Sequence, residues 1–184
     1  DRLTIGELKI SLHERGFGIL MVIFALPVSI PIPYIPGFTT IFSVPLLFLS
    51  WQMICGYDSP WLPKWLMKKS LKRSTLAFIT VKSSPILKKI EKLLHPRLTF
   101  VSSHLGTRII GFLSLIFAIS IALPLPLTNL LPGISILIMS LGLLSKDGLT
   151  ILIGMLIGIL GVVFTAAVLL VGKKIVMGLV NAIF

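Results

Sequence analysis

Apolar residues are distributed along the chain in three long runs that contain no charged residue. The runs cover residues 16–57, 109–145 and 148–172, and they are 42, 37 and 25 residues long. A helix that crosses a bilayer needs about 20 consecutive apolar residues, and helices satisfy their own backbone groups in lipid. The third run therefore predicts one crossing, and each of the first two predicts a helix, a turn and a second helix.

Proline clusters interrupt the first two runs near their centres. The first break contains four prolines between Pro27 and Pro36, and the second contains three between Pro124 and Pro132. Proline lacks an amide proton and disturbs the helical turn before it, so neither run forms one continuous helix. Each run is predicted to be a hairpin, which either crosses the membrane twice or is re-entrant and turns inside it.

The two broken runs also share dipeptides at a nearly constant separation, with offsets of 95, 97 and 96 residues. This spacing indicates an internal duplication, in which each half is an apolar helix, a proline-rich break and a second helix. By the same offset, Gln52 falls opposite Gly148, beside Asp147. The matching dipeptides are Gly16-Phe17 with Gly111-Phe112, Leu26-Pro27 with Leu123-Pro124, and Pro36-Gly37 with Pro132-Gly133.

A strongly basic segment, residues 58–108, separates the two predicted hairpins. It contains eleven lysine and arginine residues and two acidic residues. Short segments rich in lysine and arginine stay on the cytoplasmic side, and their charge favours anionic headgroups. Apolar residues are interleaved with these cations, which predicts amphipathic helices lying in the membrane interface. The position of the segment between membrane helices argues against a nucleic-acid partner.

Composition agrees with this pattern, because 55% of the residues are hydrophobic and 12% are charged, whereas soluble domains carry about 25% charged residues. The predicted fold class is an all-α integral membrane protein with four or five apolar helices in a single membrane domain. Its parts are an N-terminal polar helix (1–15), the first broken hairpin (16–57), the basic amphipathic segment (58–108), the second broken hairpin (109–147), the last span (148–172) and a tail (173–184).

The last span raises two questions that the sequence leaves open. Gly154 and Gly158 form a small-xxx-small pair, which is typical of close helix packing or of a homodimer. The higher glycine frequency of membrane helices explains the pair equally well. If this span leaves the cytoplasm, Lys173 and Lys174 lie outside, against the charge rule.

The sequence contains no visible catalytic or metal-binding arrangement. It has one cysteine and three widely spaced histidines, with no paired carboxylates. We expect no enzyme activity, metal or cofactor. The broken helices are the stronger signal, because the amino termini of helices inside a membrane suit an anionic headgroup. The alternative is that the prolines only form tight turns and that the arginines only anchor helix ends at the headgroups. The candidate substrate-binding residues are Arg15, Pro27, Pro33, Pro36, Gly37, Gln52, Arg97, Arg108, Pro124, Pro126, Asn129, Pro132, Gly133 and Asp147.

Several motifs follow one another in a distinctive order along nearly the whole chain. They are Glu14-Arg15-Gly16-Phe17-Gly18, the first break, Trp51-Gln52-Met53, Gly56, Pro60-Trp61-Leu62-Pro63, Pro96-Arg97, the second break with Asn129, and Leu141-Gly142-Leu143 through Asp147-Gly148. Together they resemble the ExoD family of exopolysaccharide-synthesis membrane proteins. The resemblance implies a multi-pass protein of the bacterial inner membrane, and it implies no catalytic residues.

Three functional hypotheses follow. In the leading one, the paired hairpins bind an anionic amphiphile, such as the polyprenyl-phosphate carrier of polysaccharide synthesis, and move it between leaflets. In the second, the chain is a non-transporting scaffold that organises polysaccharide-synthesis enzymes through its basic helices. The third is a membrane enzyme acting on lipid-linked sugars, for which the chain lacks a carboxylate pair or metal set. Anionic membrane lipids are the expected partners. The sequence does not decide whether the chain also forms a homodimer.

Overall fold

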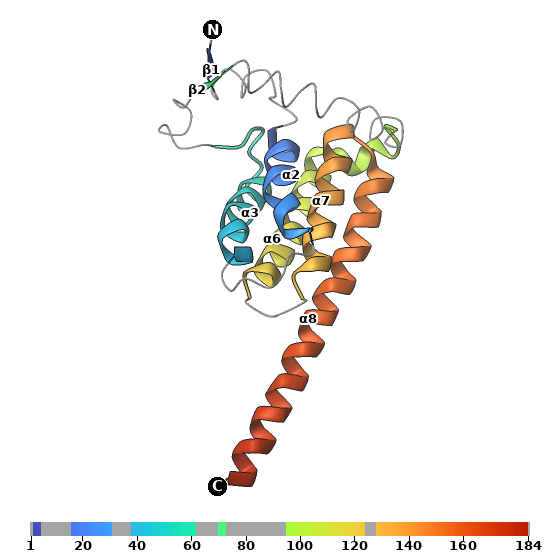
Figure 1. The fold of residues 1–184 in the computed structure, drawn as a ribbon. Helices are drawn as coiled ribbons and strands as arrows, with labels where there is room; N and C mark the ends of the chain where they lie inside the picture. The colour runs from blue at the N-terminus through green and yellow to red at the C-terminus, as the bar shows by residue number, and fades with distance from the viewer. Residues whose placement is uncertain are drawn as a thin grey trace.

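A computed structural model describes residues 2–4, 16–30, 38–61, 70–72, 95–123 and 128–183 of the chain (Figure 1). The described part is almost entirely helical, as predicted. Its elements in chain order are β1 (Arg2–Thr4), α2 (Gly16–Val28), α3 (Phe38–Ile54), β2 (Ser70–Lys72), the 3₁₀ helix η1 (Thr99–Ser102), α6 (His104–Ala122), α7 (Leu130–Ser145) and α8 (Gly148–Ile183).

The two short strands are a departure from the all-α prediction. β1 and β2 pair antiparallel, with Leu3 opposite Leu71. Three residues are too few to show an alternating pattern, and partners so far apart in the sequence leave no local signal. The predicted polar helix at residues 1–15 and the predicted amphipathic helices of the basic segment fall largely outside the described residues.

Four helices form a bundle in which each packs against two neighbours. α2 contacts α3 and α7, α6 contacts the same two helices, and α8 packs on the outside against α7 and, less extensively, α6. Figure 1 shows α8 continuing well beyond the other four helices. Apolar side chains fill the space between the helices, so the middle of the bundle is a packed core. Its fully buried members include Met21, Ala25, Leu46, Met53, Ile110, Phe117, Ala118, Ile121, Ile136 and Met139.

The outer surface of the bundle is apolar as well. Ile41, Phe112 and Leu156 are among many large hydrophobic side chains that are exposed on it. Such extensive apolar exposure is rare on soluble proteins. Among the described helices, α6 and residues Gly148–Lys174 of α8 are long and apolar enough to cross a membrane, and α2, α3 and α7 are shorter apolar helices. These features indicate a membrane protein.

Two of the prolines in the hairpins lie at helix ends, and a third lies inside a helix. Pro27 lies in the last turn of α2, and Pro132 lies in the first turn of α7, which already begins at Leu130. The prediction had placed Pro132-Gly133 inside the break, but proline fits a first helical turn because its missing amide has no partner there. α3 also continues through Pro45 as a single helix.

Close packing between helices uses the glycines of α8. A Cβ atom on Gly154 would lie 2.6 Å from Cγ of Met139, and one on Gly161 would lie 2.8 Å from Cδ of Pro132. A Cβ atom on Gly158 would collide with the ring of Phe117. The small-xxx-small pair of the sequence therefore packs α8 against α7 and α6 of the same chain.

Candidate functional site

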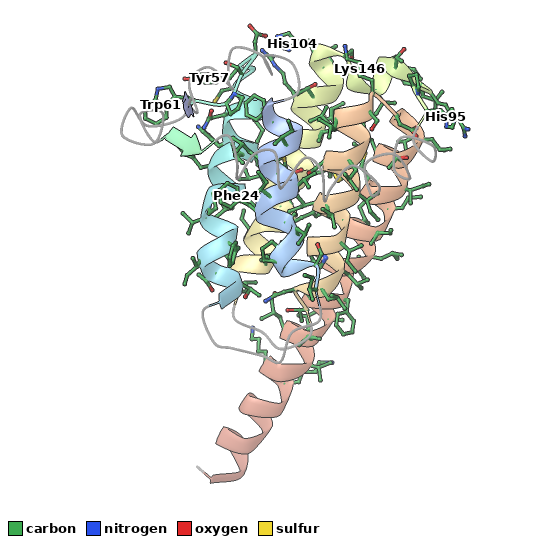
Figure 2. The ribbon with its side chains drawn as sticks, turned by 45° about the horizontal axis from the view of Figure 1, so that its top comes forward. Phe24, Tyr57, Trp61, His95, His104 and Lys146 are labelled. Carbon is green, nitrogen blue, oxygen red and sulfur yellow. The ribbon has the colours of Figure 1, made fainter. Side chains whose placement is uncertain are left out.

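The candidate residues fall at two opposite ends of the bundle. We call the end where α2, α6 and α8 begin the basic end, because it carries Arg97, His104, Arg108 and Lys146, all of them exposed. Figure 2 shows His104 and Lys146 at this end. We call the opposite end, where α3 and α7 begin, the break end. It carries Asn129.

A direct hydrogen bond joins the amino termini of α3 and α7 at the break end. Nδ2 of Asn129, which immediately precedes α7, donates to Oγ1 of Thr39 in the first turn of α3 at 2.9 Å. The hydroxyl of the buried Thr128 donates to Oδ1 of Asn129 at 3.3 Å. Asn129 itself is only 6% exposed. Within the described residues its side chain makes no capping hydrogen bond to α7.

Other break-end residues hold the two hairpins against each other. A Cβ atom on Gly133 would lie 3.1 Å from the carbonyl oxygen of Val28, so the start of α7 packs against the end of α2. Oγ1 of Thr40 donates to the carbonyl oxygen of Ala122 at 3.4 Å, which links α3 to the end of α6. Pro27 is half-buried at the end of α2.

The structure thus brings four of the candidates, Pro27, Asn129, Pro132 and Gly133, together at the break end. It also places Thr39 and Thr40 there, which the sequence analysis did not name. Two hydroxyl residues directly after a break and before an apolar helix are a helix-start signal that would have found them. The other candidates from the two breaks lie outside the described residues, and so does Arg15, which directly precedes Gly16 in the sequence. The break candidates are Pro33, Pro36, Gly37, Pro124 and Pro126.

The contacts with α8 fix the level of the break end along that helix. Pro132 meets Gly161, and the hydroxyl of Ser120 near the end of α6 donates to Oγ1 of Thr165 at 3.0 Å. Gly161 lies 13 residues after Gly148, where α8 begins, and 12 residues before Lys173. The break end therefore lies beside the middle of the uncharged part of α8.

At the basic end, Arg108 and His104 lie over the turn that ends α3. A Cβ atom on Gly56 would lie 2.7 Å from Nη2 of Arg108 and 3.1 Å from Cε1 of His104, and Gly56 has a φ of +79°. Arg97 lies at the same end, where its carbonyl oxygen accepts from the amide of Gly148 at 2.6 Å. The sequence hypothesis had Arg97 and Arg108 supply charge at the breaks. The structure places both arginines at the basic end, away from the breaks.

Gln52 holds the chain that follows α3. Its Oε1 accepts from the amide of Trp61 at 2.5 Å, and its Nε2 donates to the carbonyl oxygen of Trp61 at 3.3 Å. The ring of Trp61 packs edge-on against Phe48 with centroids 6.0 Å apart. The buried amide of Gln52 is therefore satisfied at the basic end, where it has a structural role.

Asp147 is the N-cap of α8. Its Oδ1 accepts from the amides of Leu149 at 3.1 Å and Thr150 at 3.3 Å, and its Oδ2 accepts from the hydroxyl of Thr150 at 2.9 Å. α7 ends directly before it, with Lys146 in the left-handed conformation at a φ of 54°. These bonds account for the burial of this carboxylate by helix capping. Among the described residues, none form a group of three or more metal-ligating side chains.

Comparisons with known proteins place the chain in a family. The family described as "Exopolysaccharide synthesis, ExoD" matches residues 1–167. The uncharacterized protein slr1875 of Synechocystis sp. is 38% identical over 159 residues, which cover 86% of this chain and 74% of that protein. Protein ExoD of Rhizobium meliloti is 32% identical over 155 residues, which cover 82% of this chain and 64% of that protein.

The chain thus spans less than two thirds of the length of the Rhizobium meliloti protein. No solved structure matches the chain. The extent of the family match and the identity to both relatives agree with the order of motifs along the sequence. The chain belongs to the ExoD family of exopolysaccharide synthesis.

Proposed function

We propose that the chain binds the phosphate group of an anionic lipid at the break end and moves that lipid between leaflets. The polyprenyl-phosphate carrier of polysaccharide synthesis has this chemistry and fits the family. The basic end would face the cytoplasm across a bacterial inner membrane. The observation that carries the proposal is the hydrogen bond between Asn129 and Thr39, because it brings the amino termini of two helices together.

Helix amino termini favour anions for two physical reasons. The first amides of a helix have no partner inside it, and the aligned peptide dipoles place about half a positive charge there. At the break end two such termini meet, and the side chain of Asn129 is bonded to Thr39 instead of capping α7. Nδ2 of Asn129 also carries a second proton. The arrangement therefore offers several donors to one phosphate group.

The depth of the break end supports an internal site. With a rise of about 1.5 Å per residue, Gly161 lies roughly 20 Å from Gly148 and roughly 18 Å from Lys173 along α8. A hydrocarbon core is about 30 Å thick, so a membrane centred on this stretch of α8 has the break end near its midplane. On this account both hairpins are re-entrant from the basic end. α6 is long enough to cross, but its start with His104 and Arg108 would lie among the headgroups, and its uncharged part from Ile109 to Ala122 rises by roughly 20 Å. A lipid phosphate would then meet donors halfway across.

Reciprocal glycine contacts support an internal duplication of the hairpins. A Cβ atom on Gly18 of α2 would lie 3.2 Å from the oxygen of Ser140 on α7 and 3.3 Å from the nitrogen four residues later. A Cβ atom on Gly111 of α6 would lie 3.0 Å from the oxygen of Ser50 on α3 and 3.1 Å from the nitrogen four residues later.

In each case the first helix of one hairpin packs its glycine against a serine on the second helix of the other. This register pairs Ser50 with Ser140, so it places Gln52 opposite Gly142 and not opposite Gly148. The two halves of the repeat then share the way their helices pack, and the amino termini of α3 and α7 occupy matching positions. A phosphate between them would bind on the axis that relates the two hairpins.

The test is the retention of polyprenyl phosphate by the purified protein, compared with the uncharged polyprenol of equal length by native mass spectrometry. Because hydrogen bonds to charged groups contribute about 1.5–3 kcal/mol each, we expect the phosphate to be retained at least about tenfold more tightly. An Arg108→Gln variant, which changes only the basic end, should keep this preference. Equal retention of both lipids would contradict the proposal and favour the scaffold hypothesis.

A further inference from the structure

The part of α8 beyond the break end is apolar and uncovered. Residues 166, 167 and 169–171 are all exposed, with Leu170 at 65% and Val171 at 57%. Lys173 and Lys174 follow and are exposed as well. No described atom lies within 4 Å of a Cβ position on Gly172. This stretch of α8 therefore extends alone from the four-helix bundle, as Figure 1 shows.

The pattern of exposure indicates what surrounds this stretch. Successive residues of a helix point about 100° apart, so these five exposed positions spread over about 200° of its circumference. The exposed Gly172 points into the remaining sector, which it shares with the partly buried Val168. Exposing the side chains of Leu169, Leu170 and Val171 to water would be unfavourable. A partner helix would cover one stripe and would need small residues along that stripe for close approach. Gly154, Gly158 and Gly161 already pack inside the chain, and Ala166, Ala167 and Gly172 point in three different directions around the helix. Acyl chains surround a helix on all sides.

The length of the stretch matches one leaflet. From Thr165 to Lys173 the helix rises by roughly 12 Å, and from Gly161 by roughly 18 Å. Half of a hydrocarbon core of about 30 Å is about 15 Å. We propose that the two hairpins occupy only the leaflet on the side of the basic end, and that a monolayer of lipid from the opposite leaflet lies beneath the break end and surrounds residues 166–171.

This inference rests on the re-entrant hairpins of the proposed function, but it makes no use of phosphate binding. Its test therefore uses neutral phosphatidylcholine bilayers without polyprenyl phosphate. In a Cys55→Ser background, nitroxide labels are placed on Leu131→Cys at the break end, Leu170→Cys on α8 and Leu149→Cys at the basic end, which are three exposed positions. Circular dichroism confirms that each variant is folded, and Ile41→Cys serves as a second break-end position.

Collision of the labels with oxygen, which concentrates in the bilayer centre, and with a water-soluble nickel chelate reports their depth. We expect the label at Leu131 to be the deepest, the label at Leu170 to be intermediate and the label at Leu149 to be the shallowest. A break-end label as accessible to nickel as the label at Leu149 would overturn the inference, because water would then lie beneath the hairpins. Label–label broadening at Leu170 in protein diluted with lipid would also overturn it, in favour of a second copy.

If lipid retention fails while the depth order holds, the phosphate site is wrong and the monolayer arrangement stands. If retention succeeds while the depth order fails, the phosphate binds at a break end that is open to water.

Discussion

A Gly158→Ala substitution should lower the free energy of unfolding by about 1–3 kcal/mol, because it overfills a closely packed helix crossing. The added methyl group would collide with the ring of Phe117 and the hydroxyl of Ser135. Phe117 is buried in the core and the hydroxyl of Ser135 donates to the carbonyl oxygen of Gly154 at 2.6 Å, so neither neighbour moves without losing contacts. Larger residues at this position should prevent α8 from packing at all.

The matched control is Gly172→Ala on the same helix, where no described atom lies within 4 Å of the new methyl group. Alanine has the higher helix propensity, so this variant should be as stable as the parent or more stable by up to about 1 kcal/mol. Unfolding in mixed micelles, followed by circular dichroism, measures both variants. Equal stabilities of the two variants would show that α8 does not pack against the bundle as described.

An Asn129→Asp substitution should reduce the retention of polyprenyl phosphate by at least about tenfold, because it places a negative charge beside the proposed phosphate site. Two unit charges a few ångströms apart repel by about 4 kcal/mol at an effective dielectric constant of 20, and tenfold corresponds to about 1.4 kcal/mol. The hydroxyl of Thr39 can donate to the new carboxylate, so the link between α3 and α7 is retained. The adjacent helix amino terminus also tolerates a carboxylate.

The matched control is Gln52→Glu, which makes the same change from amide to carboxylate at the basic end. Its Oε1 still accepts from the amide of Trp61, whereas the bond from Nε2 to the carbonyl oxygen of Trp61 is lost, so circular dichroism must confirm that this variant is folded. This variant should retain polyprenyl phosphate within about twofold of the parent, which is less than 0.5 kcal/mol. Native mass spectrometry in the presence of polyprenol as competitor measures both variants. Unchanged retention by Asn129→Asp would remove the break end from the site.

The helices were predictable from the sequence because membrane helices depend on long apolar runs and on proline, both of which are local features. The three uncharged runs correspond to the helix pairs α2 and α3, α6 and α7, and to α8. The boundary error at Pro132 arose because proline is compatible with a first helical turn as well as with a break. Helix α8 also continues as far as Ile183, since no proline follows Gly148 to end it.

The candidate site was only partly predictable, because its contacts join residues that are distant in the sequence. Asn129 was named, but its bond to Thr39 depends on how two hairpins pack. Asp147 was a candidate because the repeat offset placed it beside the position that matches Gln52, although an aspartate just before a long helix is a capping signal. The offset of repeated dipeptides also gave a register different from that of the packed glycines, because breaks of unequal length shift one relative to the other.

Photochemical labelling with a polyprenyl phosphate that carries a diazirine next to its phosphate would show directly where the lipid binds. The protein is reconstituted in bilayers, labelled, digested and analysed by mass spectrometry. We expect labelled peptides that contain Thr39 and Asn129. Unlabelled polyprenyl phosphate should suppress this labelling, and polyprenol should not. Labelling confined to peptides of the basic end around Arg97 and Arg108 would contradict the proposed site, because the lipid would then be held by surface cations and not by the broken helices.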